Sequence, residues 1–354
     1  MKLDFRPFDL KLRHTWTISS GAKSGGGALV AATVLVRLTD GGLTGLGEAP
    51  TTKRYAETPE RIQEFLRRVD PAKLSLADVE GSMAYLQTLA PLSYSAVCGL
   101  NTALIDGAAR AAGKAVCDYF GLGFTEKKHI TSMTIGIDTP ERVQEKTAEA
   151  APYPALKLKV GVPQDRENIQ ALRRAAPAKR VRVDANEGWT TREEALEQIE
   201  WFAKDPNVEF IEQPMPAGTP AKDLAWLKSR SPLPIFGDES YHHASDAAHC
   251  AECYHGVNVK LVKTGGVSGA FAALQAAQKA GLQTMVGCMI ESSILISAAA
   301  HLAELTNYLD VDGNLLITND PYAGCTARNG MVSFAEAQEK TGLRVRPSGV
   351  DPFA

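Results

Sequence analysis

The stretch that decides the fold lies in the middle of the chain and reads VRVDANEGW (residues 181–189), VEFIEQPM (208–215) and LPIFGDES (233–240). In each run an apolar segment rich in Val, Ile or Phe leads to a carboxylate, and a polar turn and a helical segment follow. Strands that alternate with helices in this way are typical of a parallel sheet with crossover helices. Five similar runs extend the pattern in both directions: HITSMTIGI (129–137), ALKLKVG (155–161), VNVKLVKTGG (257–266), LQTMVGCMIES (282–292) and NYLDVDG (307–313).

Eight strand–helix units at regular intervals predict a closed (β/α)₈ barrel. An open doubly wound sheet would require a glycine-rich phosphate-binding turn after its first strand, and TIGIDTPER (134–142) contains none. A barrel needs roughly 250 residues. The chain of 354 residues therefore has room for a second domain.

The first 120 or so residues have a different rhythm and predict an α+β domain. Residues 2–17 and 28–39 alternate in polarity or are β-branched, which indicates strands. Residues 58–70, 76–88 and 93–112 have helical spacing. The fold class that we expect is therefore α/β, a barrel of the TIM type with an α+β domain before it.

Composition and charge exclude several classes of partner. The net charge is −3, so no basic excess indicates nucleic acid. No apolar run reaches the roughly 18 residues of a membrane span, and the N-terminus lacks the apolar core of a signal peptide. The six cysteines are scattered, as free thiols in a reducing compartment are. We expect a cytoplasmic protein that binds neither nucleic acid nor membranes.

One cysteine-rich run, HCAECYH (249–255), could be read as a metal cluster. A single CxxC with flanking histidines is weak evidence for zinc. Because the run falls where a helix of the repeat should lie, we expect a helix there.

Ionisable residues stand at the ends of most predicted strands. Barrel active sites form at the carboxyl ends of the strands, and charges are almost never buried unless they are paired or bound to metal. These positions therefore predict a catalytic site rather than a packed core. The residues are Lys157, Lys159, Asp184, Glu212, Asp238, Lys260, Asp310 and Asp312.

Three successive strands deliver Asp184, Glu212 and Asp238 to one side of the barrel mouth. Three converging carboxylates repel one another unless a cation lies among them. Hard oxygen ligands suit Mg²⁺, and the lack of His or Cys at these positions argues against zinc. The alternative is a structural salt-bridge network with Arg182 and the lysines.

Lysines stand on opposite sides of the predicted barrel. Lys157 and Lys159 are two apart on the second strand and share a face, whereas Lys260 lies on the sixth strand, diametrically opposite. A substrate at the centre could lose a proton on one face and gain one on the other. Lysine can act as a base once burial and neighbouring cations lower its pKa. The alternative is solvated surface lysines, which apolar strands make a poor fit.

A carboxylate substrate would explain why metal and lysines occur together. The proton next to a carboxylate is scarcely acidic, and a metal that binds both carboxylate oxygens takes up the charge as it develops. Lys157 could assist as a second cation. Across the mouth, Asp310 and Asp312 could bind a substrate cation, so a dipeptide zwitterion fits the site. Alternatively, the two aspartates cap the turn-like DVDGN (310–314).

Five short motifs stand at these strand ends: Lys157-Leu158-Lys159, Asp184-Ala185-Asn186, Glu212-Gln213-Pro214, Gly237-Asp238-Glu239-Ser240, and Asn258-Val259-Lys260 ahead of Lys263-Thr264-Gly265-Gly266. As a set they resemble the enolase superfamily, in its muconate-lactonising-enzyme-like subgroup, over essentially the whole chain. The resemblance implies Mg²⁺ bound by Asp184, Glu212 and Asp238, with Lys159 and Lys260 as the acid/base pair and Lys157 as an electrostatic helper. It also implies a capping domain over residues 1–122, completed by residues 325–354, and a barrel domain over residues 123–324.

A finer resemblance concerns the last strands. Asp310-Val311-Asp312 is similar to the DxD signature of dipeptide epimerases, which holds the α-ammonium group of the substrate, and Gly287-Cys288-Met289 is similar to the seventh-strand segment of that group. The resemblance implies an epimerase that inverts the α-carbon of the C-terminal residue of a dipeptide. It would do so by a two-lysine 1,1-proton transfer through a metal-stabilised enolate, with Asp310, Asp312, Cys288 and Met289 near the substrate.

The choice of dipeptide depends on capping loops. In the Ala-Glu epimerases that this chain resembles, an arginine in the first loop binds the glutamate side chain. Lys23, in a Ser/Gly-rich loop, stands at what looks like that position, and lysine lacks the bidentate fork of arginine. Arg54 is a second candidate. Ala-Glu, hydrophobic and other dipeptides stay open.

Other functions stay open as well. An o-succinylbenzoate synthase, an N-succinylamino acid racemase or a cycloisomerase of the same superfamily would not need the two aspartates. A catalytically dead barrel that only binds a ligand would be expected to lose a lysine or a carboxylate. A Schiff-base aldolase would need one lysine but not three carboxylates. Because closed oligomers are common among such barrels, we also expect a homo-oligomer.

Overall fold

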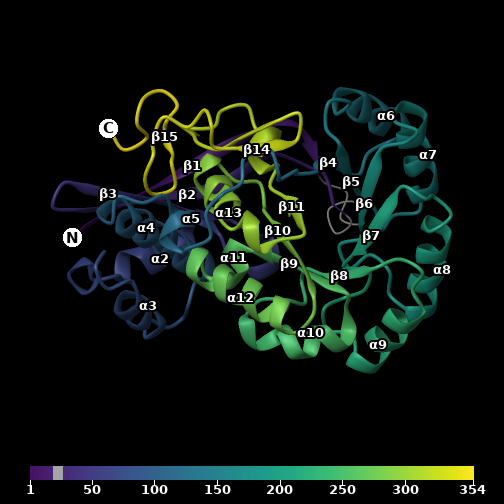
Figure 1. Cartoon of the computed structure of the whole chain (residues 1–354), viewed down its shortest axis with the longest axis horizontal. Helices are drawn as coiled ribbons and strands as arrows, with labels where there is room; N and C mark the ends of the chain where they lie inside the picture. The colour runs from purple at the N-terminus through teal and green to yellow at the C-terminus, as the bar shows by residue number, and fades with distance from the viewer. Residues whose placement is uncertain (19–26) are drawn as a thin grey trace.

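The computed structural model describes residues 1–18 and 27–354, and at its centre eight parallel strands are paired in chain order (Figure 1). A single parallel bridge between Thr131 and Leu309 joins the two edge strands, so that the sheet closes into a barrel. All eight predicted strands are present. They are β4 (Met133–Ile135), β5 (Ala155–Lys159), β6 (Arg180–Asp184), β7 (Val208–Glu212), β8 (Ile235–Gly237), β9 (Gly256–Lys260), β10 (Gln283–Gly287) and β11 (Tyr308–Asp310).

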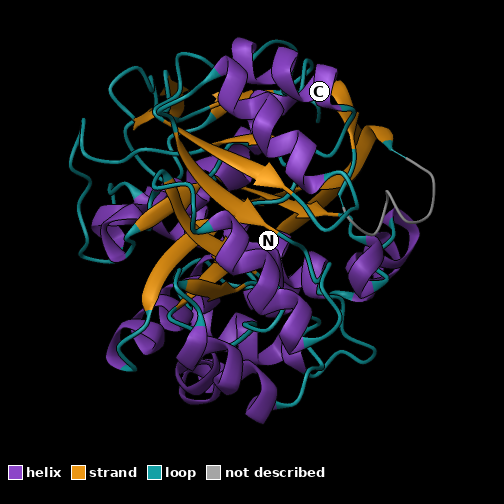
Figure 2. Ribbon diagram, turned by 90° about the vertical axis from the view of Figure 1, so that its right-hand side faces the viewer, coloured by secondary structure: helices purple, strands orange, loops and turns teal. Residues whose placement is uncertain are grey.

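Helices follow the strands and pack around the outside of the barrel (Figure 2). Their starts are encoded locally: the side chain of Thr139 accepts a hydrogen bond from the backbone N–H of Arg142, and Thr191 does the same for Glu194. The helices are α6 (Pro140–Glu149), α7 (Asp165–Ala175), α8 (Arg192–Phe202), α9 (Ala221–Arg230), α10 (Ala247–Cys253), α11 (Leu261–Thr264), α12 (Val267–Lys279) and α13 (Ser293–Ala300).

Several strands end earlier than their apolar runs. The run over residues 257–266 divides at Lys260, where β9 stops and α11 begins. Residues past the strand still pack in the core, so they are apolar without being extended. Short 3-10 helices complete the chain: η1 (Lys53–Tyr55), η2 (Pro71–Lys73), η3 (Ala244–Asp246), η4 (Ala303–Leu305) and η5 (Gly313–Leu316).

The N-terminal part is a three-stranded antiparallel sheet covered by helices. Its third strand was not predicted, because LTGLGEAP contains glycines that weaken a strand pattern. Those glycines are needed: a Cβ on Gly47 would lie 1.9 Å from Gly99 O, and one on Gly45 would lie 2.0 Å from Ala103 O. The elements are β1 (Lys2–Trp16), β2 (Ala28–Asp40), β3 (Leu43–Pro50), α2 (Pro59–Arg68), α3 (Val79–Gln87), α4 (Tyr94–Ala111) and α5 (Val116–Tyr119).

The C-terminal residues return to this N-terminal sheet, and both termini lie at that end of the molecule (Figure 1). Asp351 lies 3.3 Å from Arg37 in β2. Buried Asp106 in α4 accepts hydrogen bonds from the N–H groups of Leu46 and Leu343. The contacts are compatible with a capping unit made from both ends of the chain, while its boundaries stay a prediction. The last strands are β12 (Tyr322–Ala323), β13 (Thr326–Arg328), β14 (Met331–Ser333) and β15 (Arg346–Pro347).

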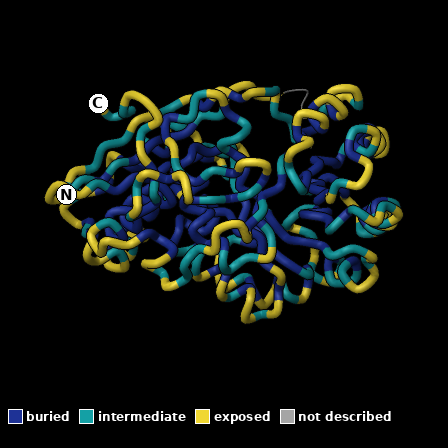
Figure 3. Tube along the Cα trace, turned by 45° about the horizontal axis from the view of Figure 1, so that its top comes forward, coloured by how far each residue is buried: buried dark blue, intermediate teal, exposed yellow. Residues whose placement is uncertain are grey.

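The buried core runs along the barrel and under the N-terminal sheet (Figure 3). All six cysteines are free thiols. Cys250 and Cys253 lie in α10, as expected of helix residues, and both are buried against neighbouring backbone. No helix among the described residues combines the length and the apolar character that crossing a membrane requires.

Candidate active site

The strand register places the predicted catalytic residues side by side at the barrel mouth. Lys159 is paired with Asp184 across β5 and β6, and Asp184 with Glu212 across β6 and β7. Asp238 follows β8 directly, and Lys260 ends β9. All five side chains are buried, none more than 9% exposed. Burial of so many charges requires close pairing.

Lys157 lies at the centre of the charged group. Its Nζ is 2.9 Å from Asp184 Oδ2, 2.7 Å from Glu212 Oε2 and 2.7 Å from Asp310 Oδ2. The side chain is only 2% exposed. One ammonium group thus contacts three carboxylates from three strands, which makes Lys157 a fixed positive centre.

The other two lysines each pair with a different carboxylate. Lys159 Nζ lies 2.6 Å from Asp184 Oδ2, and Lys260 Nζ lies 2.7 Å from Asp238 Oδ2. Their strands, β5 and β9, are four apart in an eight-stranded barrel. The two amino groups therefore approach the mouth from opposite walls.

The carboxylates control the electrostatics of the site. Burial disfavours the charge on Lys157 and Lys260, yet the carboxylates outweigh burial and raise the pKa of both lysines. The lowering of the pKa that we expected of a proton-transferring lysine is therefore not present at Lys260 in this arrangement. Conversely, the lysines overcome burial and lower the pKa of Asp184 and Asp238. Glu212 differs: burial and the charge of Asp184 raise its pKa to about 8.

Each of the three predicted metal-binding carboxylates has one oxygen held by the scaffold and one directed at the lysines. Asp184 Oδ1 accepts from Asn186 N at 2.9 Å, Glu212 Oε1 from Asn258 Nδ2 at 2.8 Å, and Asp238 Oδ1 from Lys263 Nζ at 2.6 Å. The opposite oxygens of Glu212 and Asp238 each lie 2.7 Å from a lysine Nζ, that of Lys157 and that of Lys260 respectively.

This donor set fits a hard divalent cation. The oxygens directed at the lysines belong to carboxylates, the ligands that Mg²⁺ prefers, and each of them already contacts a positively charged group. Within the described residues, no three His, Cys, Asp or Glu side chains are arranged to hold a metal ion as they stand, and lysine Nζ atoms contact the carboxylate oxygens. Asn258 and Lys263 orient two of the carboxylates, a role that sequence reasoning missed. A polar residue inside an apolar strand and a second buried lysine were the available signals.

The two aspartates of the eighth strand occupy different positions. Asp310 ends β11, which lies opposite β7 in the barrel, as expected. The Nζ of Lys157 lies between the two strands and contacts both Asp310 and Glu212. Asp312 Oδ2 accepts from Thr134 N at 2.6 Å, and its Oδ1 lies 3.9 Å from Cys288 Sγ.

The remaining predicted substrate residues are partly accounted for. Met289 Sδ lies 4.0 Å from Lys260 Nζ, so the segment after β10 borders the lysine. Arg54 Nη2 lies 2.8 Å from Glu187 Oε1 at the rim of the barrel, and its side chain is 45% exposed. This ion pair ties the loop at η1 to the barrel. Lys23 lies outside the described residues.

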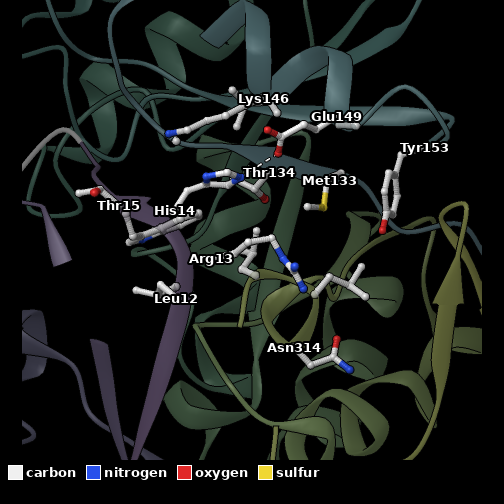
Figure 4. Close-up of a pocket in the computed structure, with 16 residues that line it drawn as sticks. Leu12, Arg13, His14, Thr15, Met133, Thr134, Lys146, Glu149, Tyr153 and Asn314 are labelled. Atoms are coloured by element: carbon white, nitrogen blue, oxygen red, sulfur yellow. Dashed lines mark hydrogen bonds and ion pairs between the residues drawn. The ribbon is translucent and has the colours of Figure 1, made fainter. Parts of the chain in front are cut away.

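A cavity of about 360 Å³ lies beside β4 (Figure 4). Residues of β1, β4, α6 and η5 line it, among them Thr134 and Asn314. His14 Nε2 and Glu149 Oε2, 2.8 Å apart, link β1 to α6 along its edge. Sequence reasoning missed this cavity, because three distant parts of the chain form it: β1, the consecutive elements β4 and α6, and η5.

Comparison with known families agrees with this geometry. Residues 15–121 match the family described as mandelate racemase / muconate lactonizing enzyme, N-terminal domain, and residues 139–321 match the enolase C-terminal domain-like family. This chain is a member of the enolase superfamily. The superfamily that the strand-end motifs resembled is thereby confirmed.

Three proteins that are similar to this enolase superfamily member are epimerases of dipeptides or of L-Ala-containing substrates, by their names. It is 59% identical to an L-Ala-D/L-amino acid epimerase from Pedosphaera parvula, over 98% of this chain and 99% of the relative. A substrate-liganded complex of the L-Ala-D/L-Glu epimerase from Bacillus subtilis has a TM-score of 0.90 and 28% identity, and the match covers 99% of both chains. A dipeptide epimerase from Enterococcus faecalis, complexed with Mg and L-Leu-L-Tyr, has a TM-score of 0.88 and 27% identity, covering 97% of this chain and 98% of that one.

Proposed function

We propose that this chain is a Mg²⁺-dependent dipeptide epimerase that inverts the α-carbon of the C-terminal residue of its substrate. The observation that carries the proposal is the pair of buried lysines, Lys159 and Lys260, which approach the mouth from opposite strands. The names of the relatives support a dipeptide substrate. The relative at 59% identity favours dipeptides that begin with L-Ala.

Asp184, Glu212 and Asp238 would hold the metal, since each has an oxygen that the scaffold leaves to a positive partner. When bound, Mg²⁺ would neutralise the negative charge that develops on the substrate carboxylate as the α-proton leaves. Lys157 stays an ammonium group, because three carboxylates surround it. It adds a second, fixed positive charge beside the same oxygens.

The two outer lysines move the proton. A neutral amine on one of them accepts the α-proton from one face of the substrate, and the ammonium group of the other donates a proton to the opposite face. The configuration inverts, and the reverse reaction exchanges the two roles, which general acid–base catalysis requires. Burial of both side chains excludes bulk water from the carbanionic state.

Proton exchange with solvent tests this function. The protein is incubated with Mg²⁺ in D₂O and a pool of L,L-dipeptides that includes L-Ala-X, and mass spectrometry detects a gain of one mass unit. We expect label at the α-carbon of the C-terminal residue, and no label in EDTA. If metal binds and no dipeptide gains label, the proposal is wrong, and N-succinylamino acids and cycloisomerase substrates become the next to test.

Two predictions from the sequence accompany this proposal. A homo-oligomer would elute from gel filtration ahead of a 37.9 kDa standard, and elution with that standard would contradict it. A cytoplasmic location would place the activity in the soluble fraction of disrupted cells, with none released by opening the outer envelope alone.

A further inference from the structure

The cavity beside β4 is separate from the charged mouth of the barrel. Among the described residues, its lining contains none of Lys157, Lys159 and Lys260, and none of the carboxylates that surround Lys157. A (β/α)₈ barrel ordinarily has a helix after each strand, but after β11 the chain forms the four-residue η5. The space beside β4 and α6 is therefore bordered by η5 and β1 and not by an eighth helix.

Apolar side chains form much of the cavity wall. Leu12 is 8% exposed and belongs to a buried cluster with Leu10 and Ile317. The volume of about 360 Å³ falls within the range of small-molecule pockets, roughly 300–1,000 Å³, which are mostly apolar with a few polar groups. The apolar lining residues include Leu12, Trp16, Met133, Ile135, Leu315 and Leu316.

Two of the basic side chains in the lining already have acidic partners. His14 Nε2 lies 2.8 Å from Glu149 Oε2, and Lys146 Nζ lies 2.8 Å from Asp138 Oδ2. Glu149 is the one carboxylate in the lining, as far as the described residues show. These pairs leave neither a spare carboxylate nor a spare positive charge at this edge of the cavity.

Arg13 differs from these two residues, because it has no carboxylate partner in the part of the chain that the structure describes. Its Nη2 donates to Ile317 O at 3.4 Å, a long hydrogen bond. The side chain extends toward the part of the cavity where Tyr153 and Asn314 lie (Figure 4). Burial and, to a smaller extent, Asp312 raise the pKa of Tyr153, and the charge of Arg13 opposes this rise, which agrees with that placement.

We propose that this cavity is a second binding site, for a small amphipathic carboxylate whose acid group pairs with Arg13 and whose apolar body lies along Leu12, Trp16 and Met133. A guanidinium group can bind a carboxylate through two parallel hydrogen bonds. The ligand should lack an ammonium group, because Glu149 is already paired with His14. This inference does not depend on the reaction at the mouth.

Three probe molecules test the chemistry of the site. Hexanoate has both the acid and the apolar body, hexylamine has the same body with the opposite charge, and propionate has the acid with a shorter body. Each is titrated into the Mg²⁺-loaded protein by isothermal calorimetry. We expect saturable binding of hexanoate, roughly tenfold or more tighter than that of propionate, because three methylene groups are lost from apolar contact. Hexylamine should not bind measurably.

Arg13→Gln should weaken hexanoate by about tenfold or more, since a hydrogen bond between charged groups is lost. Lys11→Gln is the matched control: it removes a positive charge from the same exposed strand at a residue that does not line the cavity. Its affinity for hexanoate should equal that of the wild type. Equal affinities in Arg13→Gln and the wild type would refute the proposal, as would an absence of saturable binding or equally tight binding of hexylamine.

Two further measurements locate the bound hexanoate. Leu315→Trp should fill the cavity and abolish binding, with circular dichroism to show that the variant is folded. Saturating L-Ala-L-Glu should leave the affinity for hexanoate unchanged, and displacement by the dipeptide would place hexanoate at the mouth and overturn the proposal. If the dipeptide itself does not bind, the proposed function fails, while the comparison of Arg13→Gln with Lys11→Gln still decides whether this second site exists.

Discussion

The two ends of the barrel strands are built from opposite materials. In the middle of β7 and β8 are the buried side chains of Phe210 and Phe236, stacked with ring centroids 4.3 Å apart, and Tyr308 packs edge-on against Phe210. Two residues later come Glu212, which ends β7, and Asp238, which follows β8 directly. The same strands thus carry two kinds of residue, as barrel strands generally do. The buried aromatic rings, called the floor below, stabilise the fold, and the charged side chains at the mouth are placed for chemistry.

Chelation of the metal should have the largest effect on activity, and it should leave the fold unchanged. We expect EDTA to abolish proton exchange completely and Mg²⁺ to restore it. The fold should survive, because lysines Lys157, Lys159 and Lys260 already pair with the carboxylates. Activity and circular dichroism measured on the same sample check this. Unfolding in EDTA would show that mouth and floor are not independent.

The second-largest loss of activity is expected when one of the two outer lysines is removed. Lys159→Ala and Lys260→Ala should each lower the epimerisation rate by roughly a hundred- to ten-thousand-fold, the usual share of a general acid–base group. Each variant should still exchange the α-proton of the one epimer that faces its remaining lysine. Deuterium incorporation from the L,L and L,D substrates is the measurement. Loss of exchange on both epimers in both variants would contradict a base on each face.

A substitution in the aromatic floor should lower the stability of the fold and leave the activity of the folded protein unchanged. Phe236→Ala leaves a cavity among fully buried rings and should lower the free energy of unfolding by about 3–5 kcal/mol. The kcat of the folded fraction should stay near that of wild type. Urea unfolding followed by a rate at low temperature separates the two quantities, with Phe236→Leu as the milder control. A selective fall in kcat without a loss of stability would break the division between floor and mouth.

The smallest effect is expected at the rim. The pair of Arg54 and Glu187 is partly exposed, so a double-mutant cycle with Arg54→Ala and Glu187→Gln should give a coupling of about 0.2–1 kcal/mol. Gln keeps an acceptor for Ala217 N, which Glu187 also binds. A tenfold rise in KM confined to acidic dipeptides in Arg54→Ala would instead restore the predicted role of Arg54 in substrate binding.

The strands and the identity of the charged residues could be predicted because both depend on local pattern. Val- and Ile-rich runs at a regular spacing predict a parallel barrel. A carboxylate or lysine at the end of such a run is then expected at the barrel mouth, because few other positions suit a charge there. The β3 strand was missed because Gly45 and Gly47 are explained only by their contact with α4, which a local pattern does not contain.

The sequence did not predict which charged side chains contact one another within the site. Lys157 contacts carboxylates on three strands because its side chain reaches the barrel centre, and no local pattern in the sequence specifies those contacts. The same contacts raise the pKa of Lys157 and Lys260, opposite to the direction that burial alone predicts. The roles of these residues, and of Cys288 and Met289, stay predictions until variants are measured.

The seam between β4 and β11 has a consequence for the evolution and redesign of such enzymes. The backbone bridge at this seam joins Thr131 and Leu309. Further along β4, the backbone N–H of Thr134 donates its hydrogen bond to the side chain of Asp312 and not to a backbone carbonyl. A side chain that is predicted to bind the substrate therefore also joins the two edge strands of the barrel. Lineages that trade the substrate's amine for a neutral group would have to keep an acceptor at this position, as Asn does, or first secure the seam elsewhere.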